Sequence, residues 1–551
     1  GDVDGDGDDD LFMGGGRGFS GRLYFNEKGK FVDRTPACFT EHKGCEDMAP
    51  LFVDVDGDGD RDVYLVSGGV ECEPGAAVLA DRLYLNDGKG EFAKSPPSAL
   101  PPTKDSGSVA CAADFDRDGD IDIFVGGRVI PGRYPEVPTS HLLLNDGKGN
   151  FVEAASESLS QTGLVTSALW SDVDQDGWID LLVTHEWGPV KVFQNQQGKL
   201  VDTTNESGVG NLLGWWNSIA AGDVDADGDL DYAVGNVGLN SKYHASEGHP
   251  VLLYYGDMDG AGRPRIVEAE FEGETLYPVR GRSCSSNAMP GLKKKFPTFK
   301  DFAIAPLNDI YGQEKLKGSK KLSANTLESG ILINVTKEGG APRFEFRELP
   351  RLAQISPIFG MAFTHIDGDE FPELYVVQNF FGPQRETGRM NGGVSVLLKN
   401  INGSFEPVWP NRSHLLVAGD ATALTVADLN SDGFPDFHVA VNAGVAMAFE
   451  ANPQHYTNNQ LLCLKLKGRD GNPDASGARV TVSGEVSLTQ QVSTGGGYLS
   501  QSSPRLYFPI GSSKPEAIEI QVQWPTGKIV KLLLSDLERT ADGYLIEEQS
   551  R

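Results

Sequence analysis

Acidic residues recur along this chain in one spacing: three carboxylates at alternate positions, a glycine directly after the third, and a fourth carboxylate three positions after the glycine. Carboxylates at alternate positions of a tight loop can turn their oxygens toward one point, and glycine permits the sharp turn. Hard divalent cations that take six to eight oxygen ligands are held in this way. The acidic loops are therefore predicted to be calcium sites.

Six copies of this loop are intact, one of them with an asparagine in place of an aspartate. An EF-hand would need an acidic residue at the twelfth loop position, where every copy has Met, Leu or Val, so these are not EF-hands. We expect one calcium ion in each intact loop, about six in all. The candidate ligands are Asp2, Asp4, Asp6 and Asp10; Asp54, Asp56, Asp58 and Asp62; Asp114, Asp116, Asp118 and Asp122; Asp172, Asp174, Asp176 and Asp180; Asp223, Asp225, Asp227 and Asp231; and Asp428, Asn430, Asp432 and Asp436.

Two further loops depart from the pattern. One has His365 at the first ligand position and glutamate in place of the turn glycine, and is expected to bind metal weakly or not at all. The other begins at Asp257 and Asp259 but has Arg265 at a later ligand position, where its charge would replace that of the ion. We predict that this second loop is metal-free.

Short strands must position the loops. Each intact loop is followed by a short apolar run, and most units continue with a strand–turn–strand segment such as residues 83–92. The first five loops begin 52, 60, 58 and 51 residues apart, which is the length of one supersecondary repeat. Each repeat is predicted to be one four-stranded sheet, the blade of an all-β propeller.

These repeats resemble the FG-GAP (VCBS) repeats of integrin-alpha-like β-propellers, in which a calcium loop joins the first two strands of a blade. Counting the His365 loop and omitting the Asp257 loop gives seven units, so the resemblance implies a seven-bladed β-propeller with calcium-binding blade loops. The first unit begins at its loop and lacks a preceding strand. That strand is expected from upstream sequence or from another part of the chain that closes the ring.

The C-terminal segment resembles the ASPIC/UnbV domain of cartilage acidic protein and its bacterial homologues. The resemblance rests on Gly477, residues 497–501 (GYLSQ) and Trp524-Pro525, which occur in the expected order, and it departs from the family at Ser476 and Pro509. It implies a small C-terminal β-sandwich-like domain. We expect the propeller over residues 1–455, an insertion with one or two short helices over 240–330, and the ASPIC/UnbV-like domain over 456–551. The insertion is interpreted either as a partner-facing surface or as a lid packed for stability.

The net charge and the hydrophobic pattern of the chain exclude some classes of binding partner. The formal net charge of -30 argues against nucleic acid and against an anionic membrane surface, and no apolar run approaches the length of a bilayer span. Cys38 and Cys45 are close enough in sequence for a small disulfide loop, with buried free thiols as the alternative. The chain has no initiator methionine and starts inside a motif, so the absence of a leader says nothing about export.

His185 and Glu186 form the most tempting catalytic pair, but no nucleophile motif accompanies them, and no catalytic residue or organic cofactor is assigned. We expect an exported, extracellular, cell-surface or periplasmic bacterial protein. Its predicted role is calcium-stabilised binding, adhesion or surface assembly with a protein or carbohydrate partner, without nucleic acid or a membrane span. The alternative is a metal-dependent carbohydrate-active enzyme, a lyase, dehydratase or hydrolase, that uses a propeller face.

Overall fold

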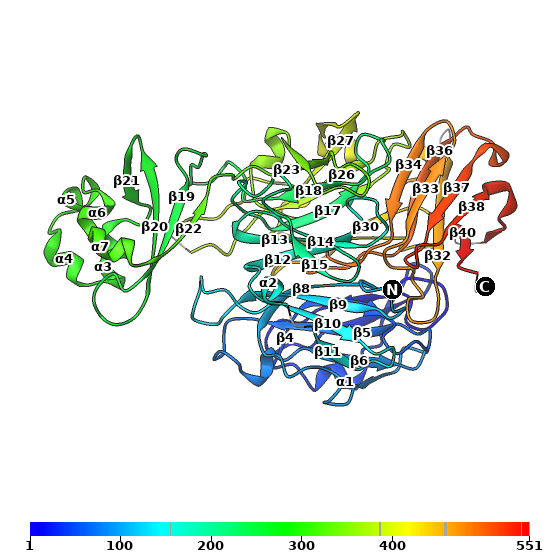
Figure 1. The fold of residues 1–551 in the computed structure, drawn as a ribbon, viewed down its shortest axis with the longest axis horizontal. Helices are drawn as coiled ribbons and strands as arrows, with labels where there is room; N and C mark the ends of the chain where they lie inside the picture. Colours follow the sequence, from blue (N-terminus) through cyan, green and yellow to red (C-terminus); the bar gives the residue numbers. More distant parts are fainter. Residues whose placement is uncertain (155, 385–386, 457–459, 541–542, 550–551) are drawn as a thin grey trace.

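The strands form small sheets stacked side by side in a propeller-like array, as the all-β prediction requires (Figure 1). The structure is a computed structural model that describes residues 1–551 except 155, 385–386, 457–459, 541–542 and 550–551. Helices in the described residues are short, and none is long and apolar enough to cross a membrane. The expected boundary between residues 455 and 456 adjoins residues 457–459, which lie outside the described residues.

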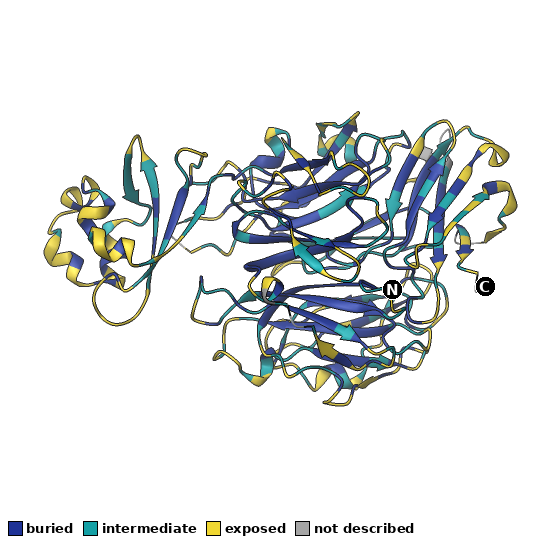
Figure 2. Cartoon of the chain, in the orientation of Figure 1, coloured by how far each residue is buried: buried dark blue, intermediate teal, exposed yellow. Residues whose placement is uncertain are grey.

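The repeat unit is an antiparallel meander in which the acidic loop joins the first two strands. In the unit with loop 54–62, β4 (Glu46–Val53) precedes the loop and β5 (Asp62–Gly68) follows it, with Val53 paired to Asp62 at the loop ends. Every residue of β5 is buried because sheets pack against both of its faces. Figure 2 shows the same burial in the central strands of the neighbouring sheets.

The same order recurs along the chain, so sequence repeats become sheets of similar size. They are β4 to β7 (β6, Arg82–Asn86; β7, Phe92–Lys94); β8 (Ser106–Ala113), β9 (Asp122–Val129), β10 (His141–Asn145) and β11 (Phe151–Glu153); β12 (Leu164–Ser171), β13 (Asp180–Gly188), β14 (Lys191–Asn195) and β15 (Leu200–Asp202), with β16 (Gly214–Trp215) beside β13; β17 (Ser218–Gly222), β18 (Asp231–Gly235), β23 (Gly330–Asn334) and β24 (Phe344–Glu348); and β25 (Ile358–Thr364), β26 (Glu373–Gln378), β27 (Val396–Ile401) and β28 (Ser404–Val408).

The first and last sheets of this series have three strands each. They are β1 (Leu11–Met13), β2 (Arg22–Asn26) and β3 (Phe31–Asp33), and β29 (Ala421–Ala427), β30 (Asp436–Val441) and β31 (Met447–Phe449). Among the described residues, β1 pairs only with β2, so the first sheet has no strand before its loop. Residues 500–503 of the C-terminal region instead form hydrogen bonds with β4 and β29. These residues form no strand and no ladder with β1, so the strand expected before the first loop is not found among the described residues.

The insertion between β18 and β23 is more structured than the sequence predicted. It holds a four-stranded sheet and five helices: β19 (Val251–Gly256), β20 (Arg265–Glu272), β21 (Thr275–Pro278), β22 (Lys320–Ala324), α3 (Arg282–Ala288), α4 (Gly291–Lys295), α5 (Phe299–Ala303), α6 (Leu307–Tyr311) and α7 (Gln313–Lys317). The prediction of one or two helices was wrong because the helices are only five to seven residues long, too short for a helical period to be visible. The helices enclose a core of their own with the sheet, including Met258, Phe302 and Ile310. They lie at the opposite end of the molecule from the C-terminal sheets (Figure 1).

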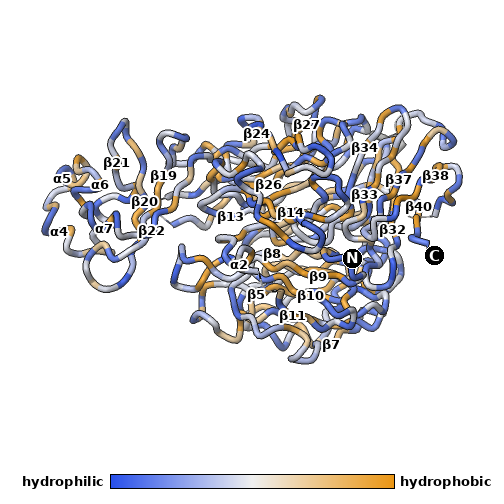
Figure 3. The backbone as a smooth tube through the Cα atoms, in the orientation of Figure 1, coloured by the Kyte–Doolittle hydropathy of each residue, from blue (hydrophilic) through white to orange (hydrophobic). Residues whose placement is uncertain are grey.

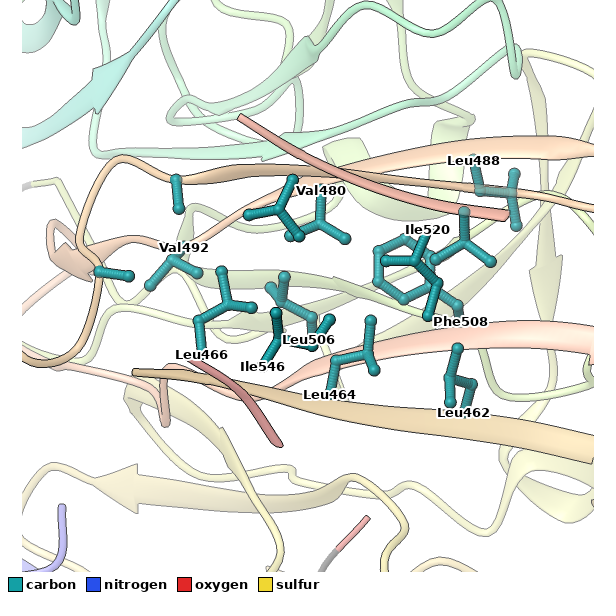
Figure 4. Close-up of a cluster of buried hydrophobic side chains, with 14 of the residues drawn as sticks. Leu462, Leu464, Leu466, Val480, Leu488, Val492, Leu506, Phe508, Ile520 and Ile546 are labelled. Carbon is teal, nitrogen blue, oxygen red and sulfur yellow. The ribbon is translucent and has the colours of Figure 1, made fainter. Parts of the chain in front are cut away.

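The C-terminal region forms two four-stranded sheets around one core. The first has β36 (Leu506–Gly511), β32 (Gln460–Lys467), β40 (Gly543–Glu547) and β39 (Arg539–Thr540); the second has β34 (Ser487–Gln491), β33 (Arg479–Ser483), β37 (Glu519–Gln523) and β38 (Ile529–Leu533). Leu464 and Phe508 of the first sheet point toward Val480 and Ile520 of the second (Figure 4). In Figure 3 strands of the propeller-like array such as β9 and β10 are largely orange, whereas many connecting loops are blue, in keeping with buried strands and solvated loops.

Candidate metal centres on the acidic loops

The first aspartate of each intact loop organises the turn. In loop 54–62 the two carboxylate oxygens of Asp54 accept hydrogen bonds from the backbone N–H groups of Gly57 (2.8 Å) and Gly59 (2.9 Å). Both glycines have positive φ, 76° and 92°, a conformation that a side chain would strain. This geometry bends the loop so that its carboxylates face one another.

Carboxylates of five loops converge closely enough to share a cation. In each group three ligand oxygens lie within 4.8 Å of one another. Loop 428–436 has the same framework, with Asp428 accepting from Asp432 (3.0 Å) and Gly433 (2.9 Å). The five groups are Asp2, Asp4 and Asp6; Asp54, Asp56 and Asp58; Asp114, Asp116 and Asp122; Asp172, Asp174 and Asp180; and Asp223, Asp225 and Asp227.

Several of these oxygens are buried and accept no hydrogen bond within the described part of the chain. They include one oxygen each of Asp56, Asp114, Asp172, Asp223 and Asp225. Buried polar atoms are normally satisfied, so each orphan oxygen calls for a partner that is not a protein donor. A divalent cation satisfies several of them at once, and all-oxygen donor sets suit calcium or magnesium better than softer metals.

Burial makes the bare carboxylates electrostatically costly. It raises the pKa of Asp54 to about 6, that of Asp114 to about 7 and that of Asp62 to about 8, with neighbouring loop carboxylates adding to each shift. Near neutral pH, therefore, such a group takes up a proton or gains a cation. The loops thus fit a metal ion in three respects: their carboxylates converge, some of their oxygens lack a hydrogen-bond donor, and their negative charges need neutralisation.

The fourth aspartate of each loop has a structural task as well. Asp62 accepts from Val55 N–H (3.0 Å) across its own loop and from Asn86 N–H (2.8 Å) at the end of β6. It therefore ties the loop to the third strand of its sheet. Asp10, Asp122, Asp180 and Asp231 accept the corresponding bond from Asn26, Asn145, Asn195 and Asn334.

Those asparagines, together with Asn400 in β27, also connect neighbouring sheets. The side chain of each donates to the carbonyl that follows the first loop aspartate of the preceding repeat. The pairs are Asn86 to Val3 (2.8 Å), Asn145 to Val55 (2.8 Å), Asn195 to Phe115 (2.8 Å), Asn334 to Val173 (3.0 Å), Asn400 to Val224 (2.8 Å) and Asn26 to Leu429 (3.1 Å). The sequence analysis missed these latches, although an asparagine stands at the same place in each strand–turn–strand segment and was the available signal.

The two divergent loops contain cations of the protein's own. Lys399 Nζ pairs with both Asp367 and Asp369 (3.1 Å to the latter), and these contacts raise the pKa of the lysine. His365, at the first ligand position, is buried, and burial lowers its pKa to about 4. In the other loop Arg265 pairs with Asp259 at 3.0 Å, which is the replacement of charge expected there.

The C-terminal region packs on the same face as the loops. Thr489 N–H donates to Asp223 (3.1 Å), and Arg505 donates to Gly7 O (2.9 Å). Arg61 of the second loop forms an ion pair with Asp474. These contacts reach separate loops, so the C-terminal sheets bridge repeats that are far apart in sequence.

The segment between β34 and β36 enters the middle of the array. β35 (Thr494–Gly495) pairs with β8, and Gly496 N–H donates to Ala110 O (3.2 Å). A Cβ added at Gly496 would lie 2.5 Å from Ala168 O, so only glycine permits this approach. Beside the segment, a cavity of about 210 Å³ is lined by inner strands β12, β17, β25 and β29.

His185 and Glu186, the pair considered for catalysis, have structural roles: Glu186 forms an ion pair and His185 is buried. Glu186 accepts from Arg128 (2.5 Å) and from the hydroxyl of Tyr134 (3.1 Å), and His185 is buried with its pKa lowered to about 4. The six cysteines are free, so Cys38 and Cys45 form no disulfide.

A propeller-like array of acidic-loop repeats, capped by a separate β region, defines the class of protein. Sequence comparison assigns residues 2–65, 54–125, 136–183, 172–234 and 365–439 to the FG-GAP-like repeat and residues 468–549 to ASPIC and UnbV. The repeat matches cover more than half of the chain, so the chain belongs to the FG-GAP-like repeat family, with a C-terminal ASPIC and UnbV domain. Comparison with curated proteins found no significant match.

Solved structures resemble the chain only distantly. Saccharomyces cerevisiae Sqt1 is 10% identical with a TM-score of 0.35, covering 81% of this chain and 93% of that one. The exotype rhamnogalacturonan lyase YesX is 12% identical with a TM-score of 0.29, covering 80% and 75%. The Bacillus licheniformis rhamnogalacturonan lyase PL11 is 10% identical with a TM-score of 0.25, covering 95% and 89%. At these TM-scores the likeness carries no argument about function.

Proposed function

We propose that this protein is an exported, seven-bladed β-propeller, stabilised by about six calcium ions, that serves in binding, adhesion or surface assembly with a protein or carbohydrate partner. The observation that carries the proposal is the set of loop carboxylates that each have one buried oxygen accepting no hydrogen bond in the described structure. A cation in each intact loop, held by the ligands named for it in the sequence, would cross-link the ends of two adjacent strands. The protein's own residues form the turn and orient the carboxylates before the ion arrives.

In this proposal the sheets from β1–β3 to β29–β31 are the seven blades, within residues 1–455. The fifth carries the insertion, and residues 456–551 form the ASPIC/UnbV domain. The segment around Gly496 lies along the axis of the ring and contacts several inner strands. The axis is thereby used for packing rather than as an open funnel toward a reaction centre.

Two features favour binding over catalysis. Glu186 is neutralised by Arg128, and His185 lies buried against its own strand, so neither is presented to a substrate. The metal-type loops lie at strand junctions and are partly covered by the C-terminal sheets, an arrangement suited to stabilising the fold. The exposed surface, including the insertion, is then available to a partner.

Calcium titration with metal analysis tests the stabilising role. Chelation is expected to lower the unfolding temperature, since each site saturated at a hundred times its Kd contributes about 2.7 kcal/mol. Asp56→Asn should remove one calcium ion per chain, whereas the matched variant Asp367→Asn, in the Lys399 loop, should leave the stoichiometry unchanged. An unfolding temperature insensitive to chelator, or a stoichiometric transition metal, would contradict the proposal.

A second assay separates binding from catalysis. Electrophoresis through gels that contain polysaccharides measures retention, and the same incubations are assayed for new reducing ends and for the absorbance of unsaturated products. Retention without product supports a binding protein, as does capture of a cell-surface protein with no turnover of glycans. Product formation that increases with time and enzyme concentration would favour the lyase or hydrolase alternative.

A further inference from the structure

The helical end of the insertion carries a charge opposite to that of the rest of the chain. Residues 281–321, which contain α3 to α7, have nine basic and three acidic residues, a net charge of +6. Since the whole chain carries -30, the remainder carries -36. We call residues 281–321 the basic tip. The charge of the whole chain argued against anionic partners, but it averages over two regions of opposite sign.

Much of this positive charge is not neutralised within the protein. Lys293, Lys294 and Lys300 are exposed, and their ammonium groups form no hydrogen bond or ion pair with any described residue. Lys295 differs, because its ammonium group donates to the carbonyls of Asp309 (2.5 Å) and Ile310 (3.1 Å) and helps to hold α4 against α6. The free lysines therefore form a surface charge available to an external anion.

Large apolar side chains are exposed close to these lysines in the sequence. Phe299 at the start of α5 is 64% exposed, and Ile304 at its end is 65% exposed. The Arg282 guanidinium lies over the Phe299 ring at 5.1 Å, and Thr298 and Asp301 cap the helix start reciprocally. The ring is thus held in place at the surface, and its exposure is a property of the fold.

The tip also lies at the end of the molecule opposite the C-terminal sheets (Figure 1), and its helices are largely exposed (Figure 2). Surface charges interact weakly beyond about 8 Å at physiological ionic strength. A flat anionic surface that meets the tip is therefore screened from most of the acidic body. Because the tip projects from the acidic body, its positive charge can attract an anionic surface.

We propose that the basic tip is a docking site for an anionic phospholipid surface. Lys293, Lys294 and Lys300 would pair with the anionic headgroups, while Phe299 and Ile304 would enter the headgroup boundary. A hydrated linear polyanion would use the lysines but would bury neither apolar side chain. The coincidence of free lysines with fixed, exposed apolar groups selects the lipid surface. This inference does not depend on calcium or on the proposed partner.

Vesicle flotation of the full chain tests the proposal, with phosphatidylcholine vesicles compared with vesicles that also contain phosphatidylserine. Binding is expected only with phosphatidylserine and is expected to weaken as salt rises. The double variant Lys293→Glu/Lys294→Glu should bind at least about 25-fold more weakly, since each lysine near such a surface contributes roughly fivefold. Lys89→Glu/Lys148→Glu makes the same change in net charge on exposed hairpin lysines elsewhere and should bind like the parent.

Phe299→Ser distinguishes a lipid surface from a polyanion. It should weaken vesicle binding while leaving any retention on immobilised dextran sulfate unchanged, and thermal unfolding of each variant checks that it folds. Equal loss of binding in both charge variants would overturn the proposal, because it would reflect net charge or calcium bridging. Failure to bind anionic vesicles would overturn it too, as would vesicle binding that is insensitive to Phe299→Ser.

Discussion

The side-chain amide of Gln501 forms two hydrogen bonds with the backbone of one residue, Phe52 in β4. Phe52 N–H donates to the amide oxygen (2.7 Å), and the amide nitrogen donates to Phe52 O (3.1 Å). On the other side, Val426 N–H in β29 donates to Ser502 (3.1 Å), and Ser503 N–H donates to Val426 O (2.9 Å). The C-terminal segment thereby supplies hydrogen bonds to strands on both sides of the incomplete first sheet.

Gln501→Ala should therefore destabilise the whole protein. It would leave the N–H and C=O of Phe52 without these partners, at a cost of about 1 to 3 kcal/mol. Urea unfolding measures the change. Gln313→Ala, at an exposed position of α7, is the control and should alter stability little. Equal effects of the two substitutions would mean that the contact with Phe52 contributes nothing.

Gly496→Ala should loosen the docking of the C-terminal sheets. Its φ is +90°, and the added Cβ would meet Ala168 O, so the segment must move away from the inner strands. Limited proteolysis should then release the C-terminal region faster than in the parent. Gly291→Ala is the matched control, because a Cβ there meets open space. An unchanged cleavage pattern would show that the segment tolerates displacement.

Asn86→Ala should break one latch between neighbouring sheets. Its buried amide donates to Val3 O (2.8 Å) and Arg61 O (3.1 Å), and the loss is expected to cost about 1 to 3 kcal/mol. Asn150→Ala, in an exposed hairpin, should stay within about 0.5 kcal/mol of the parent. Denaturant unfolding in saturating calcium compares them. The latch would be dispensable if both variants unfolded at the parent's midpoint.

Lys399→Gln should make the divergent loop dependent on an external cation. Without the ammonium group, Asp367 and Asp369 repel each other, and a metal ion can take its place between them. Because these groups are partly exposed, stability should change by about 1 kcal/mol or less. Metal analysis is expected to show additional calcium in the variant, and none in Lys89→Gln. Unchanged stoichiometry in Lys399→Gln would mean that His365 prevents a site there.

His185 should make the protein acid-sensitive. Burial lowers its pKa from 6.5 to about 4, with Lys191 lowering it and Glu186 and Asp202 opposing the shift. Below pH 6.5 the unfolded state takes up the proton first, so stability falls as pH decreases from about 6.5 to 4. The contribution is on the order of 3 kcal/mol. Stability against pH is compared for the parent and His185→Leu in saturating calcium, and the variant should have the shallower slope.

That comparison isolates one group among many. The loop aspartates are the same in both proteins, so any titration of these groups cancels in the difference. Identical slopes in the parent and His185→Leu would show that His185 is not held neutral in the folded protein.

The sequence predicted what depends on local spacing. The acidic loops, their glycine turns and the strands that follow lie within a few residues of one another, so their pattern is visible directly. Asn86 was visible too, but its acceptor, Val3 O, is 83 residues away, and no local pattern identifies it. The ion pair of Lys399 was not predicted for the same reason, because the lysine is 32 residues from Asp367.

Residues 497–501 were recognised as a motif without a role. Their role depends on Phe52, Leu424 and Val426, whose positions follow from the closed arrangement of sheets. The structure of the insertion was not predicted for a different reason. Its helices are too short to show a helical period, and β20 mixes apolar residues with glutamates. Local patterns therefore predicted the repeats, whereas contacts between distant segments had to come from the structure.

The latch from Asn26 to Leu429 joins residues 403 positions apart, while the other latches join neighbouring repeats. Closing this segment costs chain entropy before any contact forms, and that cost is recovered only when both ends make their native contacts. This latch therefore cannot form until the last repeat has been synthesised and folded, although Asn86 already joins the first repeat to the second. In a refolding experiment, protection of the Asn26 region should appear in the slowest phase, together with that of loop 428–436.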